Sequence, residues 1–151
     1  MIKEESTPYT ILMVDDDHED CLLTQYAWEE SGNPNPIHFV HDGTELMDYL
    51  YHRGRFTDSM IYPRPSMILL DLHMPKMDGH QVWQEIKKDS AMKNIPVVVV
   101  TSSYDDSDTS RTYQLGANAC MTKPWDSLEY RRMVNSLSYY WKTIIQPPLY
   151  I

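Results

Sequence analysis

The sequence predicts an α/β protein built around a doubly wound parallel sheet, and three observations support this class. Short apolar runs alternate along the chain with segments of helical periodicity, which is typical of repeated strand–helix units. The run Val97–Val100 consists of four β-branched residues and is too apolar for a strand with one face in water. Several runs end in polar or charged residues, as strands do where such a sheet binds ligands. Five strands with helices on both faces are therefore expected.

The first half of the chain contains two predicted strands, two helices and a loop. The first strand, Tyr9–Val14, ends at three consecutive aspartates, and a helix is predicted over Asp20–Ser31. The apolar residues of this helix recur at helical spacing and are Leu22, Leu23, Tyr26 and Ala27. A second strand at Ile37–His41 precedes a helix that contains Leu46–Leu50. Residues 51–65 lose this periodicity and contain glycine and proline, so they are predicted to form an extended surface loop.

The second half continues the alternation. Its predicted elements are, in order, a strand at Met67–Leu70, a helix at Gln81–Asp89, the strand at Val97–Val100, a helix with Tyr113 and Leu115 that Gly116 ends, a strand at Asn118–Thr122 and a helix from Asp126 to about Ile145. The last helix begins with a capping box formed by Asp126 and Glu129. Its apolar stripe consists of Tyr130, Met133, Val134, Leu137, Trp141 and Ile144.

Length and composition limit the class of protein. A chain of 151 residues suits one domain, with its core at about residues 9–138 and an extended C-terminal helix and tail at 139–151. The net charge of −9 disfavours nucleic-acid binding, which requires basic residues to neutralise phosphates. No segment resembles a signal peptide or a membrane span, so a cytoplasmic protein is expected. Cys21 and Cys120 are expected to be thiols rather than a disulfide.

Polar residues at the ends of the predicted strands form the candidate site. They are Asp15, Asp16, Asp71, Thr101 and Lys123. Because the carboxyl ends of parallel strands share one edge, these side chains are expected to line one cleft. Clustered carboxylates repel one another and suit a hard cation such as Mg²⁺, while a lysine and a hydroxyl suit a phosphoryl group. Asp71, which follows a strand expected to be buried on both faces, is best placed to act as a nucleophile.

Each of these residues also has a simpler interpretation. The run Asp15–Asp17 could serve only as a cap of the next helix, and Asp71 could be a loop cap. Thr101 could be a strand-end hydroxyl, and Lys123 could be a solvated charge. Their joint placement favours the site.

Four motifs in register, ILMVDDD, LLDLHMPKMDG, VVVVTSS and MTKPW, resemble the receiver domain of bacterial response regulators. The resemblance covers nearly the whole chain and implies a flavodoxin-like fold with strand order 2-1-3-4-5. It also implies that Asp71 is the phosphoacceptor, and that Asp15 and Asp16 hold Mg²⁺, or Mn²⁺ in its place, together with Asp71. The main-chain carbonyl of His73 is implied to be a further metal ligand.

The same resemblance implies roles around the phosphoryl group. Thr101 would be the switch hydroxyl, Lys123 the ion-pairing lysine, and Ser102 the small residue that admits phosphate. The bond between Lys123 and Pro124 is expected to be cis. Many receivers carry an aromatic residue three positions before the lysine, and here that position is Cys120, which puts the usual aromatic switch in doubt.

The implied function is that of a single-domain response regulator, which accepts a phosphoryl group from a histidine kinase and signals by protein–protein interaction. It would not be an enzyme acting on external substrates. The segments RPSMILLDL and SYYWKTIIQPP look similar to stand-alone regulators of cyanobacterial-type phytochrome kinases, which suggests a phytochrome as the kinase. Two alternatives stay open, a receiver-like scaffold that is not phosphorylated and a Mg²⁺-dependent phosphohydrolase with an aspartyl nucleophile.

A homodimer is also predicted. It would use the fifth strand, the last two helices and the C-terminal tail, because aromatic residues there would project beyond the domain's own core. The residues expected at this interface are Tyr113, Leu137, Tyr140, Trp141 and Ile144. The alternative is a tail that folds back on its own domain.

Overall fold

Five parallel strands form a single sheet in this computed structural model, which describes residues 10–71, 79–101, 119–124 and 126–143. The strands are β1 (Ile11–Val14), β2 (Ile37–Val40), β3 (Met67–Asp71), β4 (Val97–Thr101) and β5 (Ala119–Thr122). Their order is β2-β1-β3-β4-β5, and each neighbouring pair is parallel. The predicted fold class and strand order are confirmed.

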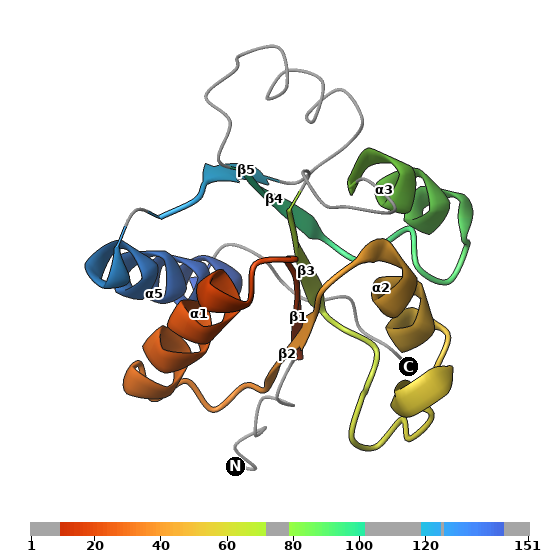
Figure 1. The fold of residues 1–151 in the computed structure, drawn as a ribbon, viewed down its shortest axis with the longest axis horizontal. Helices are drawn as coiled ribbons and strands as arrows, with labels where there is room; N and C mark the ends of the chain where they lie inside the picture. The colour runs from red at the N-terminus through yellow and green to blue at the C-terminus, as the bar shows by residue number, and fades with distance from the viewer. Residues whose placement is uncertain (1–9, 72–78, 102–118, 125, 144–151) are drawn as a thin grey trace.

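Helices cover both faces of this sheet (Figure 1). They are α1 (His18–Glu30), α2 (Gly43–Leu50), α3 (Gly79–Lys88) and α5 (Ser127–Thr143), with a short 3₁₀ helix η1 (Gly54–Phe56). Helices α1 and α5 lie on one side, and α2 and α3 on the other. The helix predicted around Tyr113 lies outside the described residues. Among the helices that the structure describes, none combines the length and apolar character that a bilayer span requires.

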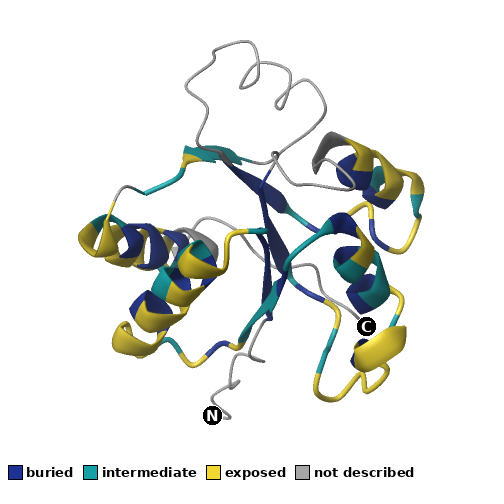
Figure 2. Cartoon of the chain, in the orientation of Figure 1, coloured by how far each residue is buried: buried dark blue, intermediate teal, exposed yellow. Residues whose placement is uncertain are grey.

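The central strands are apolar throughout because both of their faces are covered. Every residue of β1 and β3 is buried, including Asp71 at the end of β3. Successive side chains point to opposite faces, so Leu12 packs towards α2 and α3 while Met13 packs towards α1 and α5. Figure 2 shows the buried residues along the sheet and on the inner sides of the helices. The end of the sheet is therefore a place where a charged group can only be tolerated with a partner.

Helix α1 buries only part of the face that its apolar residues suggest: Ala27 is buried and Leu23 packs against the core, whereas Leu22 and Tyr26 are exposed. The helix begins two residues earlier than predicted, at His18, because Asp17 is the N-cap. Leu22 and Tyr26 are about half exposed, at 48% and 55%. The buried residues are Cys21, Thr24, Ala27 and Trp28. Hydrogen bonds make this burial acceptable, since the Thr24 hydroxyl donates to the Asp20 carbonyl at 2.8 Å and the Trp28 indole to the Asn35 carbonyl at 2.8 Å.

Helix α5 packs beside α1. The capping box is confirmed at its aspartate, whose Oδ1 accepts from the Glu129 amide at 2.9 Å. The first four residues of the predicted stripe, Tyr130, Met133, Val134 and Leu137, are buried against the sheet and α1. Leu137 is 4% exposed, because packing against the domain's own core takes most of its surface.

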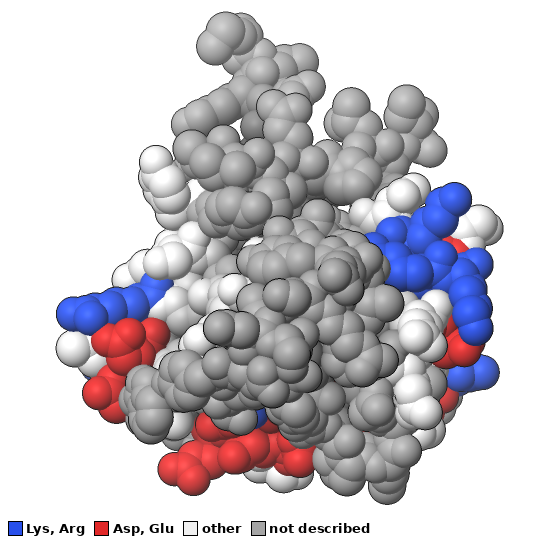
Figure 3. All heavy atoms as spheres, turned by 90° about the horizontal axis from the view of Figure 1, so that it is seen from above, with Lys and Arg blue, Asp and Glu red and all other residues white. Residues whose placement is uncertain are grey.

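An ion pair and a hydrogen bond link the α1 region to α5 on their outer sides. On this side of the molecule, basic and acidic side chains lie next to each other (Figure 3). Arg131 Nε lies 2.7 Å from Glu30 Oε2, which joins the two helices. The Asn33 amide also donates to the Ser138 hydroxyl at 2.7 Å. These links make α1 and α5 one packed unit at the side of the sheet.

The segment 51–65, predicted as an extended loop, is anchored to the domain. It contains η1, and Phe56 of this helix is buried beside Tyr49 and Tyr62. The Tyr49 hydroxyl donates to the Pro63 carbonyl at 2.8 Å, and His52 Nε2 lies 2.9 Å from the Tyr62 carbonyl oxygen. Aromatic packing and these hydrogen bonds therefore hold the segment against the domain.

Candidate functional site

The carboxyl ends of the strands bring the predicted acidic residues and lysine together. Strands β1 and β3 are neighbours, with Val14 paired to Leu70, so the residues that follow them, Asp15 and Asp71, stand side by side. A hydrogen bond to β2 also holds the backbone of Asp15 in place, because its amide donates to the Val40 carbonyl at 3.1 Å. Lys123 directly follows β5 and reaches the same edge.

Asp15, Asp16 and Asp71 form a group that could hold a metal ion. One carboxylate oxygen from each lies within 4.8 Å of the others. An octahedral Mg²⁺ with ligands at about 2.1 Å places opposite ligand oxygens about 4 Å apart, so a limit of 4.8 Å brings the three carboxylates near the spacing that such an ion requires. The donors are all carboxylate oxygens, as hard cations prefer. Asp15 and Asp71 are buried, and a cation would offset the cost of their burial.

Asp15 shows this cost most clearly. The pKa of its carboxyl is raised from an ordinary 3.8 to about 6, chiefly by burial and in smaller part by the charge of Asp71. The amide of Asp17, which donates to Asp15 Oδ1 at 2.9 Å, and the ammonium of Lys123 lower this pKa but do not cancel the effect of burial. The electrostatics of the site therefore favour a bound positive charge beside Asp15.

The ammonium of Lys123 supplies such a charge. Its Nζ lies 3.0 Å from Asp71 Oδ2, 3.1 Å from Asp15 Oδ2 and 3.0 Å from Asp20 Oδ2. Burial by itself lowers the pKa of Lys123, but the hydrogen bond to Asp20 and the charges of Asp15 and Asp71 outweigh it and raise the pKa above its usual value. Lys123 is thus held in its charged form among three carboxylates.

Chain topology explains why a lysine occupies this position. Strand β4 lies between β3 and β5. Two strand spacings of about 4.8 Å each therefore separate the end of β5 from the end of β3, and the side chain of Lys123 must cross about 10 Å to reach Asp71. A long side chain that leaves the end of β5 can span this distance, whereas a short one cannot. The arrangement leaves Asp71 with a cationic partner across the end of β4.

Two residues of this network were not predicted. Asp20, in the first turn of α1, is the third carboxylate on Lys123, and Tyr130 of α5 lies close to Asp20. Burial raises the pKa of Tyr130, and the nearby Asp20 carboxylate raises it further, so the hydroxyl keeps its proton. No spacing in the sequence indicated Asp20, because its partner Lys123 lies 103 residues away in the chain.

The remaining predicted residues are only partly described. Thr101 is the last residue of β4, where its backbone pairs with Thr122, and its side chain lies outside the description. His73 and Ser102 also lie outside the described residues. Cys120 is partly buried and packs against the core on the α2 and α3 side.

The expected cis bond between Lys123 and Pro124 is wrong. No peptide bond in the described ranges, which include both residues, is cis. The trans form is the intrinsically preferred isomer even before proline.

Comparisons with known proteins agree with this geometry. The family model for the response regulator receiver domain matches residues 11–135. The chain is 34% identical over 148 residues to "Response regulator Rcp1" of Synechocystis sp., covering 98% of this chain and 99% of that protein. It is 36% identical over 141 residues to the "Probable methanogenesis regulatory protein FilR2" of Methanothrix harundinacea, covering 93% and 88%.

Two solved structures are similar over nearly the whole chain. The phosphorylated cyanobacterial phytochrome response regulator RcpA has a TM-score of 0.84 at 34% identity, covering 95% of this chain and 100% of that one. The Mn²⁺-bound form of response regulator Rcp1 has a TM-score of 0.81 at 34% identity, covering 94% and 100%. The match to the family model and the extent of these similarities show that the chain belongs to the response regulator receiver domain family.

Proposed function

We propose that Asp71 accepts a phosphoryl group from a phosphohistidine of a histidine kinase, and that the chain signals in the cytoplasm through the resulting change of surface. The observation that carries this proposal is the position of Asp71, buried at the end of β3 between a candidate metal group and the ammonium of Lys123. Phosphoryl transfer requires mainly positioning and charge neutralisation, and both are available here.

The step is a displacement at phosphorus. An oxygen of the Asp71 carboxylate forms the new P–O bond while the P–N bond to the kinase imidazole breaks, and the imidazole nitrogen leaves with the electron pair. Lys123, already 3.0 Å from Asp71, would neutralise charge on the transferred group. Asp15, Asp16 and Asp71 would hold Mg²⁺ or Mn²⁺, which supplies charge neutralisation at the phosphoryl oxygens when bound. The similar Mn²⁺-bound structure supports a divalent ion.

Incubation with acetyl phosphate and Mg²⁺, followed by intact mass measurement, tests this proposal. We expect one phosphoryl adduct that is absent in Asp71→Asn and absent without metal. Asp58→Asn is the matched control, because Asp58 lies in the loop after η1 and its Oδ1 accepts only a local contact from the Met60 amide.

The two alternative functions give different outcomes in this experiment. No adduct under any donor concentration would contradict the proposal and favour a scaffold that is not phosphorylated. Repeated turnover of added phosphoesters would favour a phosphohydrolase.

We also propose that the kinase is a phytochrome. The similar structure of RcpA is described as a phosphorylated cyanobacterial phytochrome response regulator, and the similarity extends over 95% of this chain. Transfer from a purified phytochrome kinase that is faster than transfer from an unrelated histidine kinase would support this partner. Equal rates from both kinases would contradict it.

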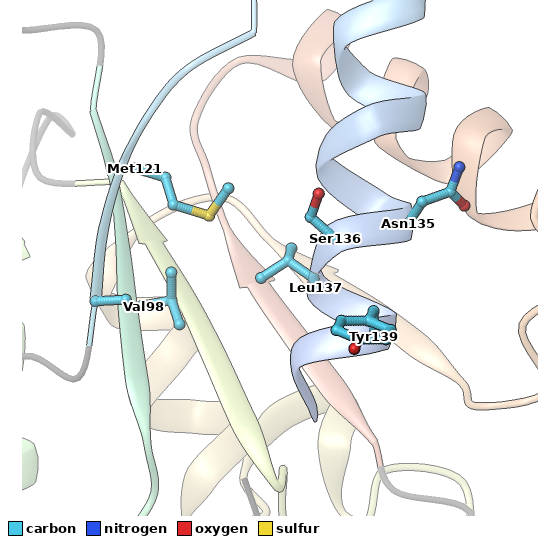
Figure 4. A pocket seen from close by; sticks show the side chains of 7 residues that line it. Val98, Met121, Asn135, Ser136, Leu137 and Tyr139 are labelled. Carbon is cyan, nitrogen blue, oxygen red and sulfur yellow. The ribbon is translucent and has the colours of Figure 1, made fainter. Parts of the chain in front are cut away.

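A homodimer is the third part of the proposal. An apolar groove of about 660 Å³ lies between the β4–β5 edge and the later turns of α5 (Figure 4). Its lining residues are Val98, Ala119, Met121, Asn135, Ser136, Leu137 and Tyr139. Tyr139 is 68% exposed beside it, and apolar surface of this kind suits a partner. Of the predicted contacts, Tyr113 and Ile144 lie outside the described residues, as do the side chains of Tyr140 and Trp141.

Light scattering over a range of concentrations, with and without phosphorylation, tests the dimer. We expect a dimer that Met121→Glu converts to a monomer, since a carboxylate in the apolar groove would be desolvated by a second copy. The control is Leu128→Glu, at a residue of α5 that is 50% exposed and away from the groove lining. A wild-type protein that stays monomeric throughout would favour the tail packing on its own domain.

A further inference from the structure

The ammonium of Lys123 has no spare donor for a phosphoryl group. A lysine ammonium carries three N–H donors, and here its Nζ contacts three different carboxylates, those of Asp15, Asp20 and Asp71. All three N···O distances are between 3.0 and 3.1 Å at the closest oxygen. A phosphoryl oxygen can therefore gain the ammonium only by displacing one of these partners.

Asp20 differs from the other two partners of Lys123. Asp15 and Asp71 belong to the group that could hold a metal ion, and a bound cation would weaken their hold on the lysine. Asp20 is not in that group. It lies in the first turn of α1, where the helix dipole stabilises a negative charge, and its side chain is only 20% exposed. Asp20 is therefore the carboxylate that competes with a phosphoryl group for Lys123.

Asp20 is also connected to α5. The hydroxyl of Tyr130 lies close enough to the Asp20 carboxylate for Asp20 to raise its pKa, and Tyr130 is 3% exposed within the core that joins α1, α5 and the sheet. A change at Asp20 therefore reaches a buried side chain of α5 directly. The groove next to β5 is lined by later residues of the same helix, including Leu137 and Tyr139.

We propose that Asp20 is a positioning residue that holds Lys123 before phosphorylation and releases it afterwards, and that Tyr130 transmits this exchange to α5. The inference rests on the proposed phosphorylation of Asp71. Before transfer, Asp20 shares the ammonium with Asp15 and Asp71. After transfer, the added negative charge draws Lys123 away, and the Asp20 carboxylate is left with Tyr130 as its remaining partner in this network.

Beryllofluoride, an acyl-phosphate analogue, provides the first test when it is titrated at saturating Mg²⁺. Asp20→Asn removes the competing charge and keeps the shape, so we expect its apparent affinity for beryllofluoride to rise by about tenfold, the effect of roughly one pKa unit of ion pairing. Asp20→Glu retains the charge and should stay close to wild type. Glu19→Gln is the matched control, because Glu19 is an exposed acidic residue in the same helical turn.

Tyr130→Phe provides the second test. Beryllofluoride should still bind this variant, but the amide chemical-shift change along α5 that binding produces in wild type should be reduced. Circular dichroism and thermal unfolding establish that each variant is folded. A loss of stability alone would not raise the affinity for an anion, so the readout separates positioning from a structural role.

The outcomes also separate this inference from the proposed function. A wild-type protein that neither binds beryllofluoride nor is phosphorylated would overturn both. A wild-type protein that binds it, with Asp20→Asn unchanged or with Glu19→Gln showing the same gain, would overturn only the role of Asp20. An undiminished response of α5 in Tyr130→Phe would overturn the transmission through Tyr130.

Discussion

The Nζ atom of Lys123 lies 3.0 Å from Oδ2 of Asp71, although β4 separates the strands from which the two residues extend. Both side chains are largely buried, with 16% of the lysine and 5% of the aspartate side chain exposed. Forming a buried ion pair costs free energy because both charges lose their hydration, and removing one partner costs more because the other charge stays buried without compensation. Lys123 therefore contributes to the stability of the site as well as to its chemistry.

Lys123→Met is expected to destabilise the metal-free protein at neutral pH by about 3 kcal/mol, because it leaves buried carboxylates without their cation. Denaturant unfolding in a chelating buffer measures this loss. Lys88→Met is the control: its ammonium is exposed and lies 3.6 Å from Glu85, so the change should stay within about 1 kcal/mol. Equal stability of Lys123→Met and wild type would contradict the buried ion-pair network.

The raised pKa of Asp15 predicts an unusual pH dependence. Its carboxyl titrates at about 6 in the folded chain against an ordinary 3.8, so the folded state binds this proton more tightly than the unfolded state. The associated stability is present below about pH 3.8 and is lost as the pH rises to about 6. A shift of about 2 units corresponds to about 3 kcal/mol.

Comparison with Asp15→Asn measures this effect. The contributions of the other titratable groups cancel when the free energy of unfolding of one protein is subtracted from that of the other. In a chelating buffer we expect the variant to be more stable than wild type at pH 7, with this advantage disappearing towards pH 4. Addition of Mg²⁺ should reduce the difference in stability at pH 7. Wild type retains all three carboxylates of the candidate metal group, so it should bind the ion more tightly and gain more stability from it than the variant. A constant difference between pH 4 and 7 would show that the Asp15 pKa is not raised.

Buried strands were the most predictable part of this fold. Strands β1, β3 and β4 are continuous apolar runs because helices cover both faces of the sheet, and the predicted bounds agree within two residues. The convergence of Asp15, Asp71 and Lys123 followed from the rule that parallel strands share a carboxyl edge. Local sequence was sufficient here because a strand end fixes the place of the residue that follows it.

Helix α1 and Asp20 show where local sequence was not sufficient. The buried face of α1 includes Thr24, whose burial depends on a hydrogen bond to the Asp20 carbonyl that the apolar pattern does not indicate. Asp20 and Lys123 are 103 residues apart in the chain. Their contact depends on how α1 packs against the end of the sheet, which no spacing within the sequence encodes.

The anchored loop after α2 gives a third prediction. Tyr49→Phe removes the hydroxyl that donates to the Pro63 carbonyl, at an expected cost of about 1 kcal/mol, while keeping the ring. The loop should then open locally, and trypsin should cut more quickly at Arg53 or Arg55, which are exposed in and next to η1. Mass spectrometry of the fragments locates the cut. Tyr26→Phe, on the exposed side of α1, is the control and should leave the rate unchanged.

The thiol of Cys21 gives the final prediction. Burial, together with the negative charges of Asp15 and Asp20, raises its pKa from an ordinary 9.0 to about 12. Its Sγ lies 3.6 Å from the Asp15 carbonyl oxygen, and the residue is 6% exposed. Only the thiolate reacts with alkylating agents, so Cys21 should resist iodoacetamide at pH 8 in the folded protein.

Peptide mapping after brief labelling measures this resistance. Cys21 should become fully labelled once the chain is unfolded in denaturant, which serves as the internal control for reagent and detection. Lys123→Met should slow native labelling of Cys21 further if the variant stays folded, because the charge of Lys123 lowers the pKa of this thiol. Rapid labelling of Cys21 in the folded wild-type protein would show that α1 does not pack against the end of β1 as described, and the contact of Asp20 with Lys123 would then lose its structural basis.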